Sequence, residues 1–145
     1  IGSAVVENPP YEFVAHTGDI RFVAHGKTMA ELFQNAAKAL YASIAEPDGV
    51  RPLVEREVET RADDRELLLV YWLSECQKAF DLDRLLLCEF RVDEISDTHV
   101  KGVARGEAYD PARHEFKSEI KAVTFHGLYV KETPDGWEAA VVCDV

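Results

Sequence analysis

Cysteine is scarce in this sequence, which holds three cysteines among 145 residues. Cys76, Cys88 and Cys143 include no Cys-x-x-Cys pair, and such an odd, sparse set does not form a disulfide framework. Each thiol lies among apolar residues, which indicates buried, reduced cysteines. We therefore expect a protein of a reducing compartment, the cytoplasm.

Basic residues are also few, since 16 Lys and Arg stand against 27 Asp and Glu, for a formal net charge of −11. Nucleic-acid binding depends on cationic side chains that displace phosphate counterions, so this balance argues against binding nucleic acid directly. It argues equally against docking on an anionic membrane. The charge fits a soluble protein that binds cations or a basic protein partner.

Long apolar runs and the common catalytic motifs are missing as well. The longest apolar stretches are too short to span a bilayer, and no signal peptide is recognisable. The sequence holds no P-loop, no Gly-x-Gly-x-x-Gly and no nucleophile elbow, and its serines show no pairing with His and Asp. We therefore expect a protein that is not an enzyme.

The sequence does have the apolar content of one globular domain. Hydrophobic residues make up 47% of the chain, which is enough for a core at this length. Residues 1–10 end in two prolines and are expected to form a flexible N-terminal tail, so the domain spans residues 11–145. The first three residues, which lack a Met, are kept out of the fold prediction.

Two stretches have helical patterns. Thr28 and Glu31 form a capping box before a helix with one apolar face, and Pro47-Asp48-Gly49 ends that helix. Asp63 and Glu66 offer a second capping box, before a helix that is apolar nearly all round. A helix of that kind is expected to be central and covered on more than one side.

The other periodic segments are expected to be strands, and turn signals at 96–98 and 134–136 join the last four strands into two hairpins. The expected strands span residues 11–15, 20–24, 54–60, 85–95, 100–108, 120–131 and 137–142. The predicted order is β-α-β-α-β-β-β-β. Strands that follow segregated helices favour an α+β fold, a single compact domain with a mainly antiparallel sheet and two principal helices packed on one face.

Asp19 and Asp144 are the main candidates for a site. Asp19 follows Gly18 in a tight turn, where an aspartate ordinarily hydrogen-bonds its own backbone. Asp144 follows an apolar strand, and Val145 after it carries the terminal carboxylate. If the last strand ends beside the segment of Asp19, three anionic groups gather, and like charges that close need a hard cation to stay ionised. Oxygen ligands favour Ca²⁺ or Mg²⁺ over Zn²⁺.

Lys121, Thr124 and His126 would add a cation, a hydroxyl and an imidazole to this site, and His16 precedes Asp19 by three residues. Two histidines with carboxylates could bind a transition metal, but we interpret them as groups that bond a main-chain carbonyl or orient a carboxylate. Lys121 either pairs with an acid on a solvated strand face or holds the acidic cluster or a nucleotide phosphate. The remaining histidines lack this context and are expected at the surface: His25, His99 and His114.

These segments together resemble the archease family, in order and over nearly the whole chain after Pro10. The resemblance rests on His16-Thr17-Gly18-Asp19-Ile20 with Gly26, Leu32-Phe33-Gln34-Asn35-Ala36-Ala37, residues 67–73 with Trp72, Gly106-Glu107, Ile120-Lys121-Ala122-Val123-Thr124-Phe125-His126-Gly127-Leu128 and Asp144-Val145. Gly18 stands where family members often have Ala, which is a conservative change.

The resemblance implies an archease-like domain and a role in tRNA processing. The resemblance implies a chaperone-like cofactor protein of the tRNA-splicing RNA ligase, as members of this family are. That ligase uses GTP to join 3′-phosphate or 2′,3′-cyclic phosphate ends to 5′-hydroxyl ends. Family members are understood to speed guanylylation of the ligase, promote multiple turnover and broaden nucleotide use. The family's metal site carries over to Asp19, Asp144 and Val145, with Ca²⁺ as the expected ion and Mg²⁺ or Mn²⁺ as alternatives.

A second function class stays open beside this one, a small metal-dependent phosphoester hydrolase that uses the same acidic groups. The absent nucleophile, and too few groups for both a metal and a general base, favour the activator. Its expected partner is the ligase, with no direct contact to nucleic acid or membrane.

Overall fold

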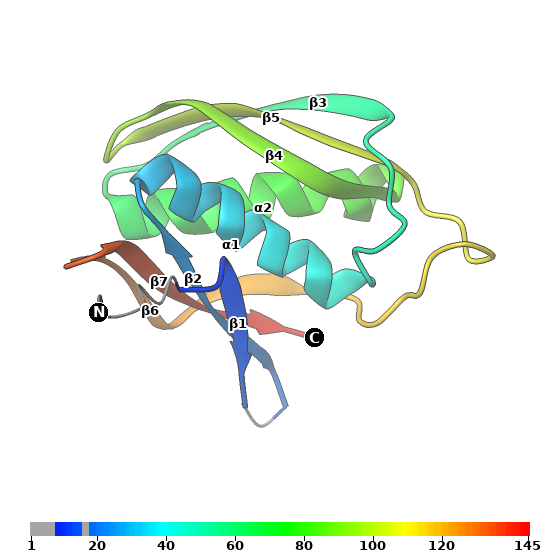
Figure 1. Cartoon of the computed structure of the whole chain (residues 1–145), viewed down its shortest axis with the longest axis horizontal. Coiled ribbons are helices and arrows are strands. Elements are labelled where there is room, and N and C mark those ends of the chain that lie inside the picture. The colour runs from blue at the N-terminus through cyan, green and yellow to red at the C-terminus, as the bar shows by residue number, and fades with distance from the viewer. Residues whose placement is uncertain (1–7, 16–17) are drawn as a thin grey trace, which may run out of the picture.

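The computed structural model describes residues 8–15 and 18–145 of the chain (Figure 1). Its elements are β1 (Tyr11–Val14), β2 (Ile20–Gly26), α1 (Met29–Ile44), β3 (Val54–Arg61), α2 (Arg65–Asp83), β4 (Leu85–Ile95), β5 (His99–Ala108), β6 (Ala122–Thr133) and β7 (Gly136–Asp144). The α+β class and the antiparallel pairing are confirmed. The first β in the predicted order β-α-β-α-β-β-β-β corresponds to two strands, β1 and β2, which form a hairpin. Residues 1–7 of the predicted tail lie outside the described residues.

The strands form two sheets, where the sequence predicted one. One sheet has the order β1-β2-β7-β6 and the other has the order β3-β5-β4. Both helices lie between the two sheets, so each sheet carries them on one face (Figure 1). Helix α2 contacts β3, β4 and β5 on one side and β6 on the other. A helix that is apolar nearly all round needs cover on both sides, which explains the second sheet and confirms the predicted central position of α2.

The helix starts follow local capping. The Oγ1 atom of Thr28 accepts a hydrogen bond from the main-chain N–H of Glu31 at 3.1 Å, as in a capping box. The Glu31 carboxylate accepts one at 3.3 Å from the main-chain N–H of Lys27, one residue before the cap. At α2 the cap is Asp64, which accepts from the main-chain N–H of Leu67 at 2.8 Å. The predicted second cap, Asp63, was therefore one residue early.

The core lies where the helices meet the sheets. Phe22, Phe33 and Trp72 are fully buried, and the Trp72 indole N–H donates to the Phe33 carbonyl at 3.0 Å, which joins α2 to α1. Cys76 and Cys143 are buried and Cys88 is half-buried, and all three are free thiols, in agreement with the sequence. Among the described residues, none of the helices has the length and apolar character needed to cross a membrane.

Candidate functional site

Strand pairing brings Asp19 and Asp144 to the same end of the four-stranded sheet. Ile20 at the start of β2 lies opposite Cys143 of the antiparallel β7, so the residues outside this pair, Asp19 and Asp144, are neighbours across the two strands. Asp19 is half-buried and Asp144 is exposed. Burial raises the pKa of the Cys143 thiol to about 12, and the charges of Asp144 and Asp19 add to that rise. Both carboxylates therefore lie near the Cys143 thiol, as the strand register requires.

Strand β6 flanks this end of β7 and fixes its main chain. The main-chain N–H of Lys121 donates to the carbonyl of Asp144 at 2.8 Å. Further along, the Thr124 hydroxyl donates to the carbonyl of Val142 at 2.9 Å and accepts from the main-chain N–H of His126 at 3.3 Å. These bonds hold the strand that carries Asp144 in one position.

Beyond Thr124 the ladder between β6 and β7 is interrupted. The pairs Thr124–Val142 and Tyr129–Ala140 are five residues apart on β6 but two apart on β7. Gly127, inside this bulge, has a φ of 60°, in the left-handed region that favours glycine. The bulge leaves the side chains of Phe125 and His126 exposed.

The structure thus gathers part of the predicted set. Asp19 and Asp144 lie side by side, and the exposed Val145 follows Asp144 directly. Thr124 turns its hydroxyl to the main chain of β7, while the side chains of Lys121 and His126 are exposed. The predicted role of His16 falls on a residue outside the described ones.

The donors at this end suit a hard cation. Within residues 8–15 and 18–145, no three His, Cys, Asp or Glu side chains group closely enough to hold a metal ion. A cation between Asp19 and Asp144 would therefore complete its coordination with other oxygen atoms. A donor set made only of oxygen favours Ca²⁺, Mg²⁺ or Mn²⁺.

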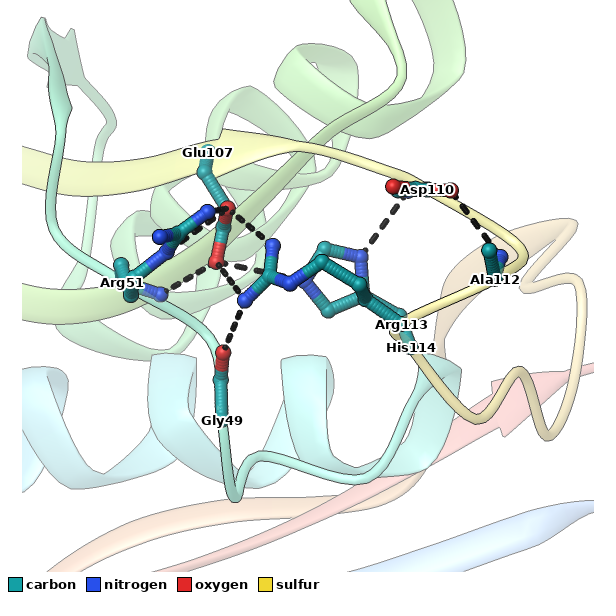
Figure 2. A network of polar contacts seen from close by, with 7 residues as sticks. All are labelled: Gly49, Arg51, Glu107, Asp110, Ala112, Arg113 and His114. Carbon is teal, nitrogen blue, oxygen red and sulfur yellow. Dashed lines mark hydrogen bonds and ion pairs between the residues drawn. The ribbon is translucent and has the colours of Figure 1, made fainter.

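A second polar cluster, which the sequence did not predict, surrounds Glu107 at the end of β5 (Figure 2). Its carboxylate accepts from the main-chain N–H of Arg51 at 2.6 Å, from Arg113 Nη1 at 2.7 Å and from the side chain of Arg51 at 3.2 Å. His114 Nε2 lies 3.2 Å from the same carboxylate, and Arg113 also donates to the Gly49 carbonyl at 3.0 Å. Three separate segments of the chain therefore meet on one acid.

The cluster at Glu107 is structural. Glu107 is 5% exposed, yet hydrogen bonds from Arg113 and then Arg51 hold the pKa of its carboxyl well below the usual range, although burial acts in the opposite direction. Its partners occupy both carboxylate oxygens, so the Glu107 side chain joins the loop before β3 to the loop after β5. The sequence signal was an acid within a buried strand, followed closely by Arg113 and His114.

Two histidines that were expected at the surface are buried. His114 is 6% exposed, and its Nδ1 atom accepts a hydrogen bond from the main-chain N–H of Asp110. His25 is 9% exposed and lies between Glu12 and Glu138, at 3.5 and 3.6 Å. The surface prediction was wrong for both, because acids on neighbouring segments provide polar contacts that the local sequence does not reveal. His99 is half-buried and pairs with Glu59.

Two antiparallel sheets that enclose two helices, with a pair of carboxylates where β2 meets β7, define a class of compact α+β protein. The chain belongs to the archease family, since the model of the Archease protein family (MTH1598/TM1083) matches residues 11–145. Protein archease of Methanosarcina acetivorans is 44% identical over an alignment of 139 residues that covers 93% of this chain and 95% of that protein. The archease of Pyrococcus furiosus is 35% identical over 93% of this chain and 98% of its own length.

Solved structures agree with the fold. The solution structure of Methanobacterium thermoautotrophicum protein 1598 matches with a TM-score of 0.76 at 33% identity, over 94% of this chain and 99% of that one. The crystal structure of a Thermotoga maritima protein, described as an archease and possible chaperone, matches with a TM-score of 0.65 at 19% identity, over 99% and 100% of the two chains. The second likeness concerns the fold alone.

Proposed function

We propose that this protein activates the tRNA-splicing RNA ligase, the role that membership of the archease family implies. In this proposal it promotes guanylylation of the ligase with GTP, supports multiple turnover and broadens nucleotide use. It acts as a cofactor protein without catalysing a reaction of its own. Its partner is the ligase, which joins 3′-phosphate and 5′-hydroxyl RNA ends.

The observation that carries the proposal is the pairing of Ile20 with Cys143. It brings Asp19 and Asp144, which are distant in sequence, to the same end of the four-stranded sheet. In the proposal, these two carboxylates and Val145 are the ligands of Ca²⁺, or of Mg²⁺ or Mn²⁺ in its place. A bound cation of this kind supplies positive charge that can neutralise phosphate oxygens.

The rest of the site positions these ligands. The hydrogen bonds from Lys121 and Thr124 to the main chain of β7 fix the strand that carries Asp144. On the other side, Asp19 directly precedes β2, whose ladder to β7 is regular from Ile20 to Gly26. Both carboxylates are therefore held on neighbouring strands before a cation binds, which lowers the entropic cost of binding.

The net charge of the chain supports a protein partner over RNA. A formal charge of −11 opposes the approach of phosphate and favours contact with a basic surface. In the proposal the ligase holds the RNA, and the acidic end of the sheet at Asp19 and Asp144 faces the ligase.

The experiment is an RNA-joining assay with the ligase in limiting amount. The Asp19→Asn and Asp144→Asn variants are compared with the wild type and with Asp97→Asn, a matched change in the exposed β4–β5 turn. We expect the wild type and the control to raise the number of turnovers per ligase, and the two site variants to leave it at the level of ligase alone. Equal stimulation by all four proteins would show that Asp19 and Asp144 are not needed to activate the ligase.

A second assay separates the activator from the alternative function. The protein alone, with Mg²⁺ or Mn²⁺, is incubated with simple phosphoesters. We expect no turnover. Hydrolysis that Asp19→Asn abolishes and Asp97→Asn retains would favour the metal-dependent hydrolase.

A further inference from the structure

A pocket lies at the end of the four-stranded sheet opposite to Asp19 and Asp144. The turn from β2 into α1 and the turn from β6 into β7 enclose about 390 Å³, which lies within the roughly 300–1,000 Å³ of ordinary ligand pockets. Strand β2 runs from Asp19 at one end of the sheet to this pocket at the other. An inference about this pocket therefore stands apart from the proposed cation site.

The walls of the pocket are fixed by close backbone contacts. A Cβ atom on Gly26 would lie 2.3 Å from the main-chain nitrogen of Leu32, and one on Gly136 would lie 2.3 Å from the carbonyl oxygen of Gly26. The two turns and the start of α1 therefore touch through main-chain atoms. A pocket between such turns is preformed, because its walls cannot close without moving backbone.

Asn35 presents an unpaired acceptor to this pocket. The residue is 8% exposed, and its Nδ2 atom donates to the carbonyl of His25 at 2.7 Å, which fixes the amide with Oδ1 as the remaining polar atom. Within the part of the chain that the structure describes, no group donates a hydrogen bond to that oxygen. Since Asn35 lines the pocket, this oxygen is an acceptor that a hydrogen-bond donor on a ligand can reach.

The other polar groups of the pocket are also mainly acceptors and carry net negative charge. Among the described residues, the carboxylates of Glu31 and Asp135 and the hydroxyl of Thr133 line it together with Lys27, and His25 in the same wall already lies between Glu12 and Glu138. Two carboxylates against one ammonium favour a cationic ligand, and several acceptors around one space favour a ligand with several N–H donors.

Trp137 supplies an apolar wall. Its indole lines the pocket, and the Arg65 guanidinium lies 5.2 Å from the ring centroid, which holds the ring in place. An alkyl stem can pack on such a wall while the charged head reaches the carboxylates. We propose that this pocket binds a guanidinium or ammonium group on an alkyl stem, from either a small amine or a basic side chain of a partner protein.

The test titrates the full chain with argininamide and with citrullinamide, which has the same shape but no charge. The chain has two tryptophans, of which Trp72 is fully buried, so a change in fluorescence reports on Trp137. We expect a saturable change with argininamide and none with citrullinamide. A capped Gly-Gly-Arg-Gly-Gly peptide distinguishes the two sources, because a peptide that binds as well as argininamide indicates a protein partner, and binding of argininamide alone indicates a small amine.

The controls are two pairs of substitutions. Glu31→Gln with Asp135→Asn removes both negative charges of the wall, whereas Glu57→Gln with Asp97→Asn makes the same chemical changes at exposed positions of the other sheet. The first pair should weaken argininamide binding at least about tenfold and the second should leave it unchanged. Asp135→Asn alone, in the exposed β6–β7 turn, gives a variant that leaves the capping box intact. Binding of citrullinamide equal to that of argininamide, no saturable binding, or unchanged affinity in these pocket variants would overturn the proposal.

Discussion

At the scale of single residues, Glu107 shows how neighbours can keep a buried acid ionised. The carboxylate is almost inaccessible to water but receives hydrogen bonds from Arg51 and Arg113 and lies against His114 (Figure 2). The pKa of its carboxyl is held well below the usual range, and the hydrogen bond from Arg113 is the largest cause. This acid therefore links the stability of the fold to pH.

We predict that Glu107 stabilises the fold at neutral pH and loses that effect in acid. The pKa of the carboxyl is lower in the folded than in the unfolded state, so the folded state binds fewer protons and stability falls as pH falls. The effect is complete above the unfolded pKa of about 4.3 and declines as the pH drops from there towards the folded pKa. Thermal melts of the wild type and Glu107→Gln should therefore differ most near neutral pH and draw gradually closer as the pH falls below about 4 towards the folded pKa.

The control for Glu107 is Glu119→Gln, which removes an exposed acid paired with Arg84. Exposed pairs contribute little, so its melting temperature should stay close to that of the wild type at every pH. A difference between the wild type and Glu107→Gln that stays constant from neutral to acidic pH would contradict the link to the carboxyl pKa.

We also predict that Ca²⁺ stabilises the protein through Asp19 and Asp144. A ligand at 100 times its Kd adds about 2.7 kcal/mol to the free energy of unfolding. Without Ca²⁺, Asp19→Asn and Asp144→Asn should unfold within about 0.5 kcal/mol of the wild type, since neither change leaves a cavity. With Ca²⁺, only the wild type and Asp97→Asn should gain stability.

Calorimetric titration with Ca²⁺ measures the same binding directly, and a Gly added after Val145 tests whether the terminal carboxylate takes part. If both aspartate variants bind Ca²⁺ as well as the wild type, Asp19 and Asp144 are not its ligands. If only the extended chain does so, the terminal carboxylate alone is not a ligand.

At the scale of elements, glycines allow β4 and β5 to pack closely. A Cβ atom on Gly102 would lie 2.2 Å from the Arg91 carbonyl oxygen, and one on Gly106 would lie 1.7 Å from that of Leu86. The register of β4 against β5 shifts near both positions, between Leu87 and Glu89 and between Val92 and Glu94. Bulges in β4 and glycines in β5 thus occur together, as expected where two backbones approach closely.

We predict that Gly106→Ala destabilises the fold by at least about 2 kcal/mol, because the added methyl meets main-chain atoms that cannot turn aside. Gly49→Ala is the comparison. Gly49 has a φ of 88° but open space around it, so its cost is limited to the roughly 1–2 kcal/mol of a left-handed conformation. Unfolding in urea measures both. A cost for Gly106→Ala no larger than that for Gly49→Ala would show that β4 moves away easily.

The elements themselves were largely predictable, but their neighbours were not. The bounds of β4 match the prediction, and α2 has the central place that its apolar surface indicated. Alternation in a strand tells which residues face the core but does not tell which strand lies beside it, so one sheet was predicted where there are two. The bulge after Thr124 also escaped prediction, because the apolar pattern of residues 120–131 runs through it.

The candidate sites differ in the same way. The prediction at Asp19 and Asp144 needed one long-range pairing, between the last strand and the segment of Asp19, and that pairing is present. The cluster at Glu107 needs Arg51 and the segment of Arg113 and His114 to meet, and neither pairing leaves a periodic trace in the sequence. Binding of a cation at the first site stays a prediction.

At the scale of the whole molecule, net charge is the main constraint on partners. The formal charge is −11, and on the three-stranded sheet Arg105 pairs with Glu55 and Arg91 with Asp93. Cations that are already paired with acids are poor contacts for phosphate. We therefore expect the molecule as a whole to repel nucleic acid.

We predict that the protein alone does not bind RNA. Non-specific RNA binding comes from cations that release counterions, and proteins that bind this way have Kd values of roughly 10⁻⁴–10⁻⁶ M. A gel-shift assay with a broken tRNA stem should show no complex at about 10 µM protein, whereas the ligase should shift the same RNA. A complex formed by this chain alone, which weakens steeply with salt, would contradict the prediction and favour an RNA-binding module.

The place of β7 in its sheet has a consequence for synthesis of the chain. This strand lies between β2 and β6, so β2 leaves the ribosome with β1 but long before its second partner, β7, exists. The three-stranded sheet, drawn from residues 54–108, can close earlier and cover one side of the helices. Their other apolar side stays open until residues 136–144 emerge, so the nascent protein is most prone to aggregation while β7 is still missing.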